Sequence, residues 1–428
     1  MRITQFLLVL KLNILATLTF LMLAHQNLAF AENSNTQITL QQATALALQA
    51  NPTVVIFLRK RDIESGQTVQ AAARPNPTLS GQIEDLRSQN RIATIAISQQ
   101  LETASKRDKR IANADINAAI ADIDVEIAQA DITAKVYAAF YQVLAAQQAQ
   151  ALALELLSIS TQSKETTAKR VLAGKISPVE TTKAKVAEAG LKIDLANANQ
   201  QLATAKQQLA SLWAKGLQVQ EQSDYLAVGE LEKISSLPSL SDLIAQLPES
   251  PRLKKAALAV SQKQSLVAIE QSKQTPDLTL SLGARRNEEL GGITQAIIGL
   301  LIPIPIFDQN QGNLQSAQSR ELQSADEKIV LENQIKTDLT NIYSKRQLQI
   351  EAADMYIQDI LPGAQSAYEA ARKGFEFGKF SFLEVLDAQR TLFQAKTQYI
   401  QTLALAHQAT ADIYALLGSA SIQSANKE

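Results

Sequence analysis

Two patterns of apolar and polar residues recur along this chain. The first is a long stretch rich in Ala, Gln, Leu, Lys and Glu, clearest over residues 106–173, which contain neither proline nor glycine. The second is a short stretch in which apolar and polar residues alternate, clearest over residues 277–285. Helices produce the first pattern, whereas strands with two unlike faces produce the second. The sequence therefore predicts a mixed α+β protein in which long helices predominate.

The long helices exceed what a globular domain can contain. At about 1.5 Å per residue, residues 106–173 would extend about 100 Å. Residues 312–373 are predicted to form a second long helical stretch. A helix of this length without a wide apolar face must pack along similar helices, as in a coiled coil. Return helices are expected over residues 178–213 and 382–417. We therefore expect two long helical hairpins.

Each hairpin has the residues that a tight turn between helices requires. Glycine can take the left-handed conformation that ends a helix, and serine caps the helix that follows. A glutamate three residues after the serine completes a capping-box pattern. The first turn has Gly174, Ser177 and Glu180, and the second has Gly378, Ser381 and Glu384.

Four short segments are predicted as strands, in two pairs. Residues 78–84, 91–99 and 277–285 alternate clearly, whereas residues 293–304 are more apolar and alternate poorly. A tilted strand needs about 9 to 11 residues to cross a bilayer. Four strands cannot close a barrel, and an open sheet edge cannot face lipid, so a spanning chain must oligomerise. Three copies would supply twelve strands; the alternative left open is a soluble periplasmic sheet with one buried face.

The two halves of the chain have the same order of segments, which indicates a duplication. Residues 52–77 align without gaps on residues 251–276. The expected segments are a signal peptide (1–31), an N-terminal periplasmic helix (32–76), a first β-hairpin (77–101), a first helical hairpin (102–213), a linker (214–240), a second-repeat helix (241–276), a second β-hairpin (277–306), a second helical hairpin (307–418) and a C-terminal tail (419–428).

The N-terminus and the composition indicate export. Basic Arg2 and Lys11, an apolar stretch and the closing Ala29-Phe30-Ala31 predict a secretory signal peptide, with an N-terminal membrane anchor as the alternative. The sequence has no cysteine, which excludes disulfides, thiolate metal sites and the usual cysteine-linked lipid anchor. Its net charge of -1 gives no electrostatic reason to expect nucleic acid. After residue 31, no apolar run is long enough to predict a spanning helix.

Several ordered motifs resemble the TolC family of outer-membrane efflux proteins. They are TLQQA and ALQANP within residues 39–52, RPNP at 74–77, PIPIFDQNQG at 303–312 and GKFSFLEVLD at 378–387. The motif PIPIFDQNQG, together with SQQLE and KR within residues 98–107, is most similar to the heavy-metal (cobalt–zinc–cadmium) resistance branch. The resemblance covers essentially all of the chain after the signal peptide.

The resemblance implies a homotrimer whose twelve-stranded barrel lies in the outer membrane and whose helices form a coiled-coil tunnel across the periplasm. It implies outer-membrane lipid, a periplasmic adaptor protein and an inner-membrane pump of the RND type as partners. The implied function is passive conduction of substrates, metal cations among them, through a tripartite efflux system. The alternatives are an outlet for type I protein secretion or drug efflux, and a periplasmic coiled-coil adaptor or scaffold.

By the same resemblance, Glu384 and Asp387 match the acidic positions at the periplasmic entrance of the family. They lie three positions apart and so face the same way; three copies would form two carboxylate rings that favour cations. The alternative is that both acids only stabilise the start of a helix. The exposed tips would contact the adaptor through Gly174, Lys175, Ser177, Gly378, Lys379 and Ser381.

The sequence contains no pattern that predicts catalysis. His407 is the only histidine after the signal peptide, and we expect it to be an ordinary packed or surface residue of a helix. No His and Cys cluster predicts a metal site, and no phosphate-binding glycine loop or nucleophile motif is present. We therefore expect no enzyme activity, no cofactor and no resident metal.

Overall fold

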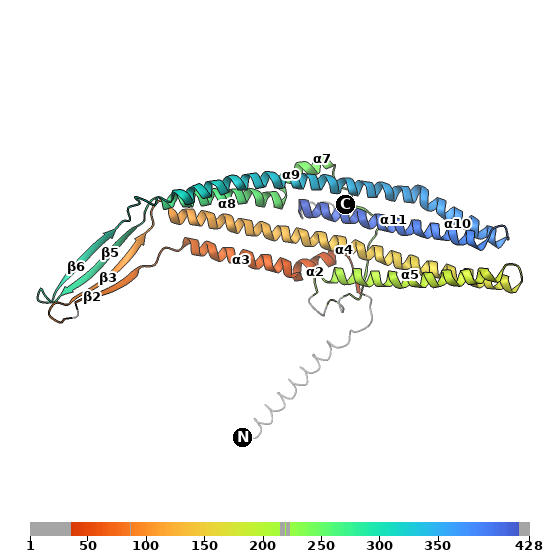
Figure 1. Cartoon of the computed structure of the whole chain (residues 1–428), viewed down its shortest axis with the longest axis horizontal. Helices are drawn as coiled ribbons and strands as arrows, with labels where there is room; N and C mark the ends of the chain where they lie inside the picture. The colour runs from red at the N-terminus through yellow and green to blue at the C-terminus, as the bar shows by residue number, and fades with distance from the viewer. Residues whose placement is uncertain (1–35, 86, 215–218, 220–222, 419–428) are drawn as a thin grey trace, which may run out of the picture.

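The computed structural model describes residues 36–85, 87–214, 219 and 223–418. This part of the chain is elongated, with a four-stranded sheet at one end and a layer of long helices along the rest (Figure 1). The expected signal peptide (1–31) and C-terminal tail (419–428) lie outside the described residues. None of the described helices combines the length and the hydropathy that crossing a membrane would require.

The sheet contains the four expected strands, all antiparallel, in the spatial order β2-β3-β5-β6. They are β2 (Thr78–Glu84), β3 (Ile92–Leu101), β5 (Leu278–Asn287) and β6 (Ile293–Leu301). The register aligns one apolar row across all of them, made of Leu79, Ile97, Leu282 and Ile298. Each of these side chains is at least 50% exposed. One face of the sheet is therefore an apolar surface that the rest of the described chain leaves uncovered.

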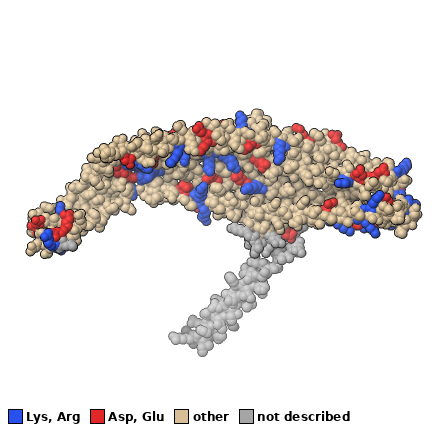
Figure 2. Space-filling view, in the orientation of Figure 1, with Lys and Arg blue, Asp and Glu red and all other residues tan. Residues whose placement is uncertain are grey.

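The opposite face of the sheet carries hydroxyl groups and small residues. The hydroxyl oxygens of Ser98 and Ser281 lie 2.8 Å apart across β3 and β5. Apolar Ile297, which spoils the alternation of β6, pairs with Gly283, which in turn pairs with Ala96. Figure 2 shows charged atoms at the turns and near the helices, with none on the visible face of the strands between them. The poor alternation of β6 thus reflects a large residue placed beside two small ones.

The helices form a layer that is four helices wide (Figure 1). The longest helix, α4 (Lys106–Leu172), runs along the whole layer. Beside it on one side lie α3 (Pro52–Ala72) and α5 (Pro178–Ala210), and on the other side α8 (Pro251–Lys273) and α11 (Phe382–Leu417). Beyond these lie α9 (Gln311–Met355) and its continuation α10 (Leu361–Glu376). The expectation of two long helical hairpins is confirmed.

Two helices that we expected to be continuous are interrupted, each at a proline. The N-terminal periplasmic helix expected within residues 32–76 is divided into α2 (Leu40–Ala50) and α3, because Asn51 takes an extended conformation and caps the helix that Pro52 begins. The helix expected over residues 312–373 contains a π-helical turn, Tyr356–Ile360. Pro362, which follows it, has no N–H and collides with the carbonyl one turn earlier, so a wider turn accommodates it.

Short segments cover one side of the helical layer near its middle, and we call them the covering segments: α2, β1 (Thr36–Ile38), β4 (Tyr225–Ala227), residues 228–239 and α7 (Leu240–Gln246). β1 pairs with β4 in parallel, and α7 packs on α9. We expected residues 214–240 to be a plain linker, so β4, which is only three residues long, was missed. The main apolar core lies between the covering segments and the long helices: Tyr225 and Leu231 of the covering segments pack with Phe140, Leu144 and Leu209 of α4 and α5.

His407 lies in this core and is fully buried. Its ring stacks on Tyr141 with 3.5 Å between centroids. Its Nε2 lies 2.9 Å from the Leu231 carbonyl oxygen, and its Nδ1 lies 3.1 Å from the Tyr137 hydroxyl. Because a carbonyl only accepts, Nε2 carries the proton and Nδ1 accepts from the tyrosine. Burial, with a smaller contribution from the charge of Arg346, lowers the pKa of His407 to about 4. His407 is therefore a neutral packing residue, as expected.

Candidate functional site

The two helical hairpins end in turns of the expected kind. Gly174 has a φ of 69° and Gly378 a φ of 73°, both in the left-handed region. In each turn the glycine N–H donates to the carbonyl three residues earlier, that of Val171 or Phe375, at 2.9 Å. Both glycines, and the lysines that follow them, are exposed. The tips are therefore an accessible end of the helical layer.

The two tips differ in how their return helices are capped. The Ser381 Oγ accepts from the Glu384 N–H at 3.4 Å, and the Glu384 carboxylate accepts from the Ser381 N–H at 2.6 Å, which completes a capping box. At the first tip, Ser177 caps α5, but the carboxylate of Glu180 instead binds the Lys183 ammonium at 3.0 Å. The capping box expected at Glu180 is wrong, because an adjacent cation competes for the carboxylate.

Both candidate acids are exposed near the start of α11. The hydrogen bonds from Ser381 lower the pKa of Glu384, so this carboxyl is ionised at neutral pH. Glu384 thus already acts as a helix cap. The Asp387 carboxylate has no hydrogen-bond or ion-pair partner within the described part of the chain. Asp387 is therefore the acid whose charge is available to a solute at the tip.

Arg170 links the two tips, a contact that the sequence did not predict. This residue, near the end of α4, donates to the carbonyl oxygens of Phe375 at 2.7 Å and Glu376 at 3.0 Å. Its guanidinium lies 4.5 Å from the centroid of the Phe375 ring. The carbonyls belong to the C-terminus of α10, where a positive charge is favourable. A basic residue in the last turn of a helix was the available signal, but it does not say which helix end is bound.

An Arg170→Ala variant is expected to exchange the backbone amides of residues 374–380 about tenfold faster, since it loses charged hydrogen bonds worth about 1–2 kcal/mol at this partly exposed site. Hydrogen-exchange mass spectrometry measures the rate. Arg372→Ala is the matched control, because Arg372 is exposed and pairs with Glu376 at 3.1 Å on its own helix. Equal exchange in the two variants would show that Arg170 does not hold the tips together.

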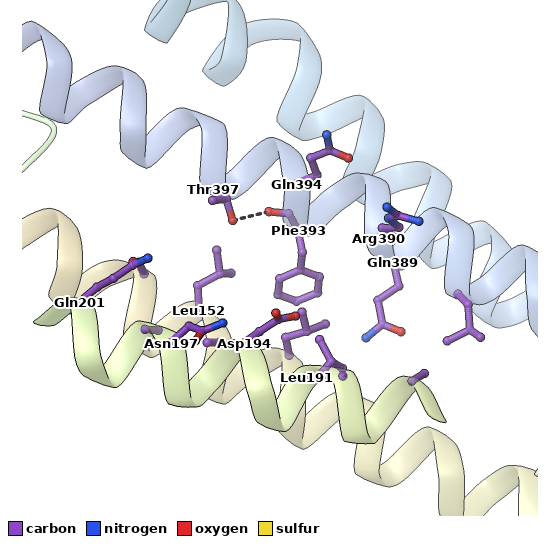
Figure 3. A pocket seen from close by; sticks show the side chains of 17 residues that line it. Leu152, Leu191, Asp194, Asn197, Gln201, Gln389, Arg390, Phe393, Gln394 and Thr397 are labelled. Atoms are coloured by element: carbon purple, nitrogen blue, oxygen red, sulfur yellow. Dashed lines mark hydrogen bonds between the residues drawn. The ribbon is translucent and has the colours of Figure 1, made fainter. Parts of the chain in front are cut away.

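Between the tips and the middle of the helical layer, a groove of about 850 Å³ lies between α5 and α11 and is also lined by α4 (Figure 3). Phe393 points into it from α11, close to Leu152 and Leu191, and Asp194 and Arg390 lie on the α5 and α11 sides (Figure 3). The hydroxyl of Thr397, the one hydroxyl in the lining, donates to the Phe393 carbonyl at 2.9 Å. The lining therefore offers a surface with apolar and charged parts and no activated nucleophile.

The described residues also contain no group of three His, Cys, Asp or Glu side chains placed to hold a metal ion. The chemistry that the tips present consists of exposed carboxylates, lysines and left-handed turns. Such groups can attract ions and bind another protein.

Comparison with known proteins relates most of the chain to efflux channels. The family model for outer membrane efflux proteins matches residues 45–215 and 245–419. The cobalt-zinc-cadmium resistance protein CzcC of Cupriavidus metallidurans is 38% identical over 384 residues, which cover 89% of this chain and 90% of CzcC. The two matched stretches of the family model correspond to the two halves seen in the sequence.

Solved channel structures have the same fold. The structure of CusC matches with a TM-score of 0.75 and 19% identity, covering 91% of this chain and 96% of CusC. The open-state MtrE outer membrane channel of Neisseria gonorrhoeae matches with a TM-score of 0.72 and 18% identity, covering 88% of each chain. At these identities the likeness concerns the fold alone. The expected fold class, a long helical tunnel joined to barrel strands, is confirmed.

Proposed function

Because the chain belongs to the outer membrane efflux protein family, we propose that three copies close edge to edge into one efflux channel. The channel crosses the outer membrane as a barrel, continues into the periplasm as a helical tunnel and conducts solutes passively outward. The open sheet carries this proposal: its apolar face is exposed, and its outer strands β2 and β6 each have one unpaired side. Lipid tolerates an apolar face but not an open edge.

Closure into a trimer accounts for both edges of the chain. β2, α3 and α5 follow one edge from the sheet to the tip, and β6, α9 and α10 follow the other (Figure 1). Pairing β2 of one copy with β6 of the next gives twelve strands and removes every open edge. The alternative, a periplasmic coiled-coil adaptor, would leave this apolar sheet face exposed to water, which is unfavourable.

A fractionation experiment tests this architecture. The protein is expected in the outer-membrane fraction as a trimer that heating dissociates on a denaturing gel. Release of the protein by osmotic shock, as for a soluble periplasmic protein, would overturn the proposal.

We infer that the tips are the contact with a periplasmic adaptor, which links the channel to an inner-membrane pump of the RND type. The tip residues Gly174, Lys175, Ser177, Gly378, Lys379 and Ser381 are exposed, and two of them are glycines that let another backbone approach closely. Each copy presents two tips, so a trimer offers six similar docking positions.

Metal cations are the proposed cargo. The relative CzcC is named for resistance to cobalt, zinc and cadmium, and the exposed acids Glu384 and Asp387 of three copies would place six carboxylates at the entrance. Cells that lack this gene are expected to become sensitive to these metals. Sensitivity to drugs, or loss of a secreted protein, with unchanged metal tolerance would instead favour the drug-efflux or type I secretion alternative.

Removing the proposed entrance charge is expected to reduce cation preference. In planar bilayers, Asp387→Asn should lower the cation-to-anion permeability ratio severalfold, because a ring of three carboxylates is lost from a constriction. Adding Glu384→Gln should lower it further. The reversal potential in a KCl gradient measures the ratio. Glu230→Gln, which neutralises an exposed acid of the covering segments, is the control; a ratio that stays unchanged in all variants would refute the entrance role.

A further inference from the structure

A second groove, of about 600 Å³, crosses the middle of the helical layer and is rich in charge. It is lined from all four helices, α3, α4, α8 and α9, and Figure 2 shows basic and acidic side chains gathered over the middle of the molecule. Its cations are Lys60, Lys135, Arg252, Lys255 and Lys328, and its acids are Asp124, Asp131 and Glu327. We call this the mid-tunnel groove.

The cations of the mid-tunnel groove outnumber its acids. Asp124 is buried and binds Lys255 at 2.6 Å and, more weakly, Lys60 at 3.5 Å. Asp131 binds Arg252 at 2.6 Å. After this pairing, Lys135 and Lys328 have no acidic partner within the described part of the chain. Five cations against three acids leave two positive charges in each copy.

The mid-tunnel groove lies on the face of α4 opposite to the covering segments. Gln147 accepts from the Ala227 N–H and donates to the Ala227 carbonyl, both at 3.0 Å, so its side of α4 faces β4. Phe140 lies on the same side, in the core beneath the covering segments. At about 3.6 residues per turn, Asp131 and Lys135 point to the opposite side of the helix. The groove and the covering segments therefore occupy different faces of the layer.

The neighbouring helices α8 and α3 also have one face toward the covering segments and another toward the groove. On α8, Leu253 packs with Leu243 of α7, whereas Lys255, two residues later, lines the groove. On α3, Val54 lies in the core, whereas Lys60, six residues later, lines the groove. When three such layers close edge to edge, segments packed across the inner face would obstruct the duct. The covering segments therefore lie outside, and the mid-tunnel groove faces the lumen.

From this placement we propose that the mid-tunnel groove is a binding site for polyvalent anions inside the duct; the proposal rests on the trimeric channel proposed above. Three copies bring six surplus positive charges to one level of the lumen, and rings of Lys and Arg favour anions in a pore. The screening length is about 8 Å at physiological salt, so this ring acts on solutes in the lumen and not on the distant tips. The duct thus combines an acidic entrance with a basic middle.

Polyanion block of the open channel tests this site. Tripolyphosphate, added to one side of a bilayer that contains the trimer in divalent-free KCl, is expected to reduce the current at low salt and much less at about 1 M salt, where screening is strong. Lys135→Gln with Lys328→Gln should raise the blocking concentration at least about tenfold, since both unpaired cations are lost from each copy. Glutamine has nearly the same helix propensity as lysine, so both substitutions should keep the helices intact.

A double substitution of lysines outside the groove provides the control. Lys233→Gln with Lys254→Gln removes two exposed lysines that do not line the groove, one from the covering segments and one from α8, and it should leave the block unchanged. A block that is equally strong in the groove variant and in the unmodified protein, or equally weakened in the control, overturns the anion site alone. A purified protein that forms no channel at all overturns the proposed function and the anion site with it.

Discussion

A Gly283→Leu variant is expected to lose at least about nine-tenths of its trimer from the outer membrane. Gly283 lies in β5 at a position where a Cβ would be 2.5 Å from the carbonyl oxygen of Ile95 and 2.8 Å from the Cβ of Ala96. Both neighbours belong to the paired strand β3, so neither can move without breaking the ladder. Overpacking of this kind costs about 1–3 kcal/mol per site, and the barrel contains the site three times. Heat-modifiable trimer in membrane fractions measures the loss.

Gly81 provides the matched control for this variant. It is also a glycine in a strand of the sheet, yet nothing lies within 4 Å of the Cβ that a substitution would add. It shares the apolar row of Ile95 and Ala284, which faces outward in the proposed barrel. Gly81→Leu is therefore expected to assemble normally. Normal assembly of Gly283→Leu would show that the strands are not paired in this register.

Acid is expected to destabilise the trimer through His407. Burial lowers the pKa of His407 to about 4 from the ordinary 6.5. Between these two pH values, His407 is protonated in the unfolded chain and neutral in the folded chain. The stabilisation from the neutral ring is complete above pH 6.5, falls as the pH decreases from 6.5 towards 4, and is lost below 4. The difference corresponds to about 3 kcal/mol per copy. The midpoint of thermal unfolding, measured in detergent between pH 8 and pH 4.5, should fall over this interval.

A His407→Gln variant separates this effect from the titration of carboxylates. The glutamine amide can still donate to the Leu231 carbonyl, but it has no pKa in this range. The variant is expected to be less stable than the unmodified protein at pH 8, because the stacking on Tyr141 is lost, and to lose less further stability on acidification. Parallel pH profiles for the two proteins would exclude His407 as the titrating group.

The sequence predicted the strands well but not their neighbours. The alternation over residues 277–285 belongs to one strand and is visible locally, whereas the pairing of β3 with β5 joins residues that are more than 170 positions apart. The poor alternation of β6 could not be interpreted from its own residues. It became understandable once Ile297 was found beside Gly283, because a large side chain can lie over a glycine on either face of a sheet.

The breaks in the helices follow from local sequence rules, whereas the contact between the two hairpins does not. Proline disfavours helix in the residue before it, so Asn51 and Pro52 could have predicted the break between α2 and α3. The same reasoning applies to Pro362, although the sequence does not say that a π turn would absorb it. Arg170 is different, because its acceptors lie on the other hairpin and no local pattern encodes that contact.

The sequence predicted the residues of the two hairpin tips, but it did not predict which faces of the helices point into the duct. The glycine and serine turns follow from local chemistry, and the structure has them at the expected residues. The mid-tunnel groove combines single residues from four helices, and each helix shows only a weak apolar face. The inner and outer faces could be assigned only after the position of the covering segments was known.

The π turn at Tyr356–Ile360 has a mechanical consequence. α4 is an uninterrupted helix of 67 residues, which makes the first arm of the duplicated pair a stiff rod. The second arm is jointed, because its regular hydrogen-bond ladder is broken between α9 and α10. A force applied at the tips would therefore bend one arm at a fixed place and leave the other straight. The two halves, similar in sequence, differ in compliance, and the compliant half is the one that carries Glu384 and Asp387.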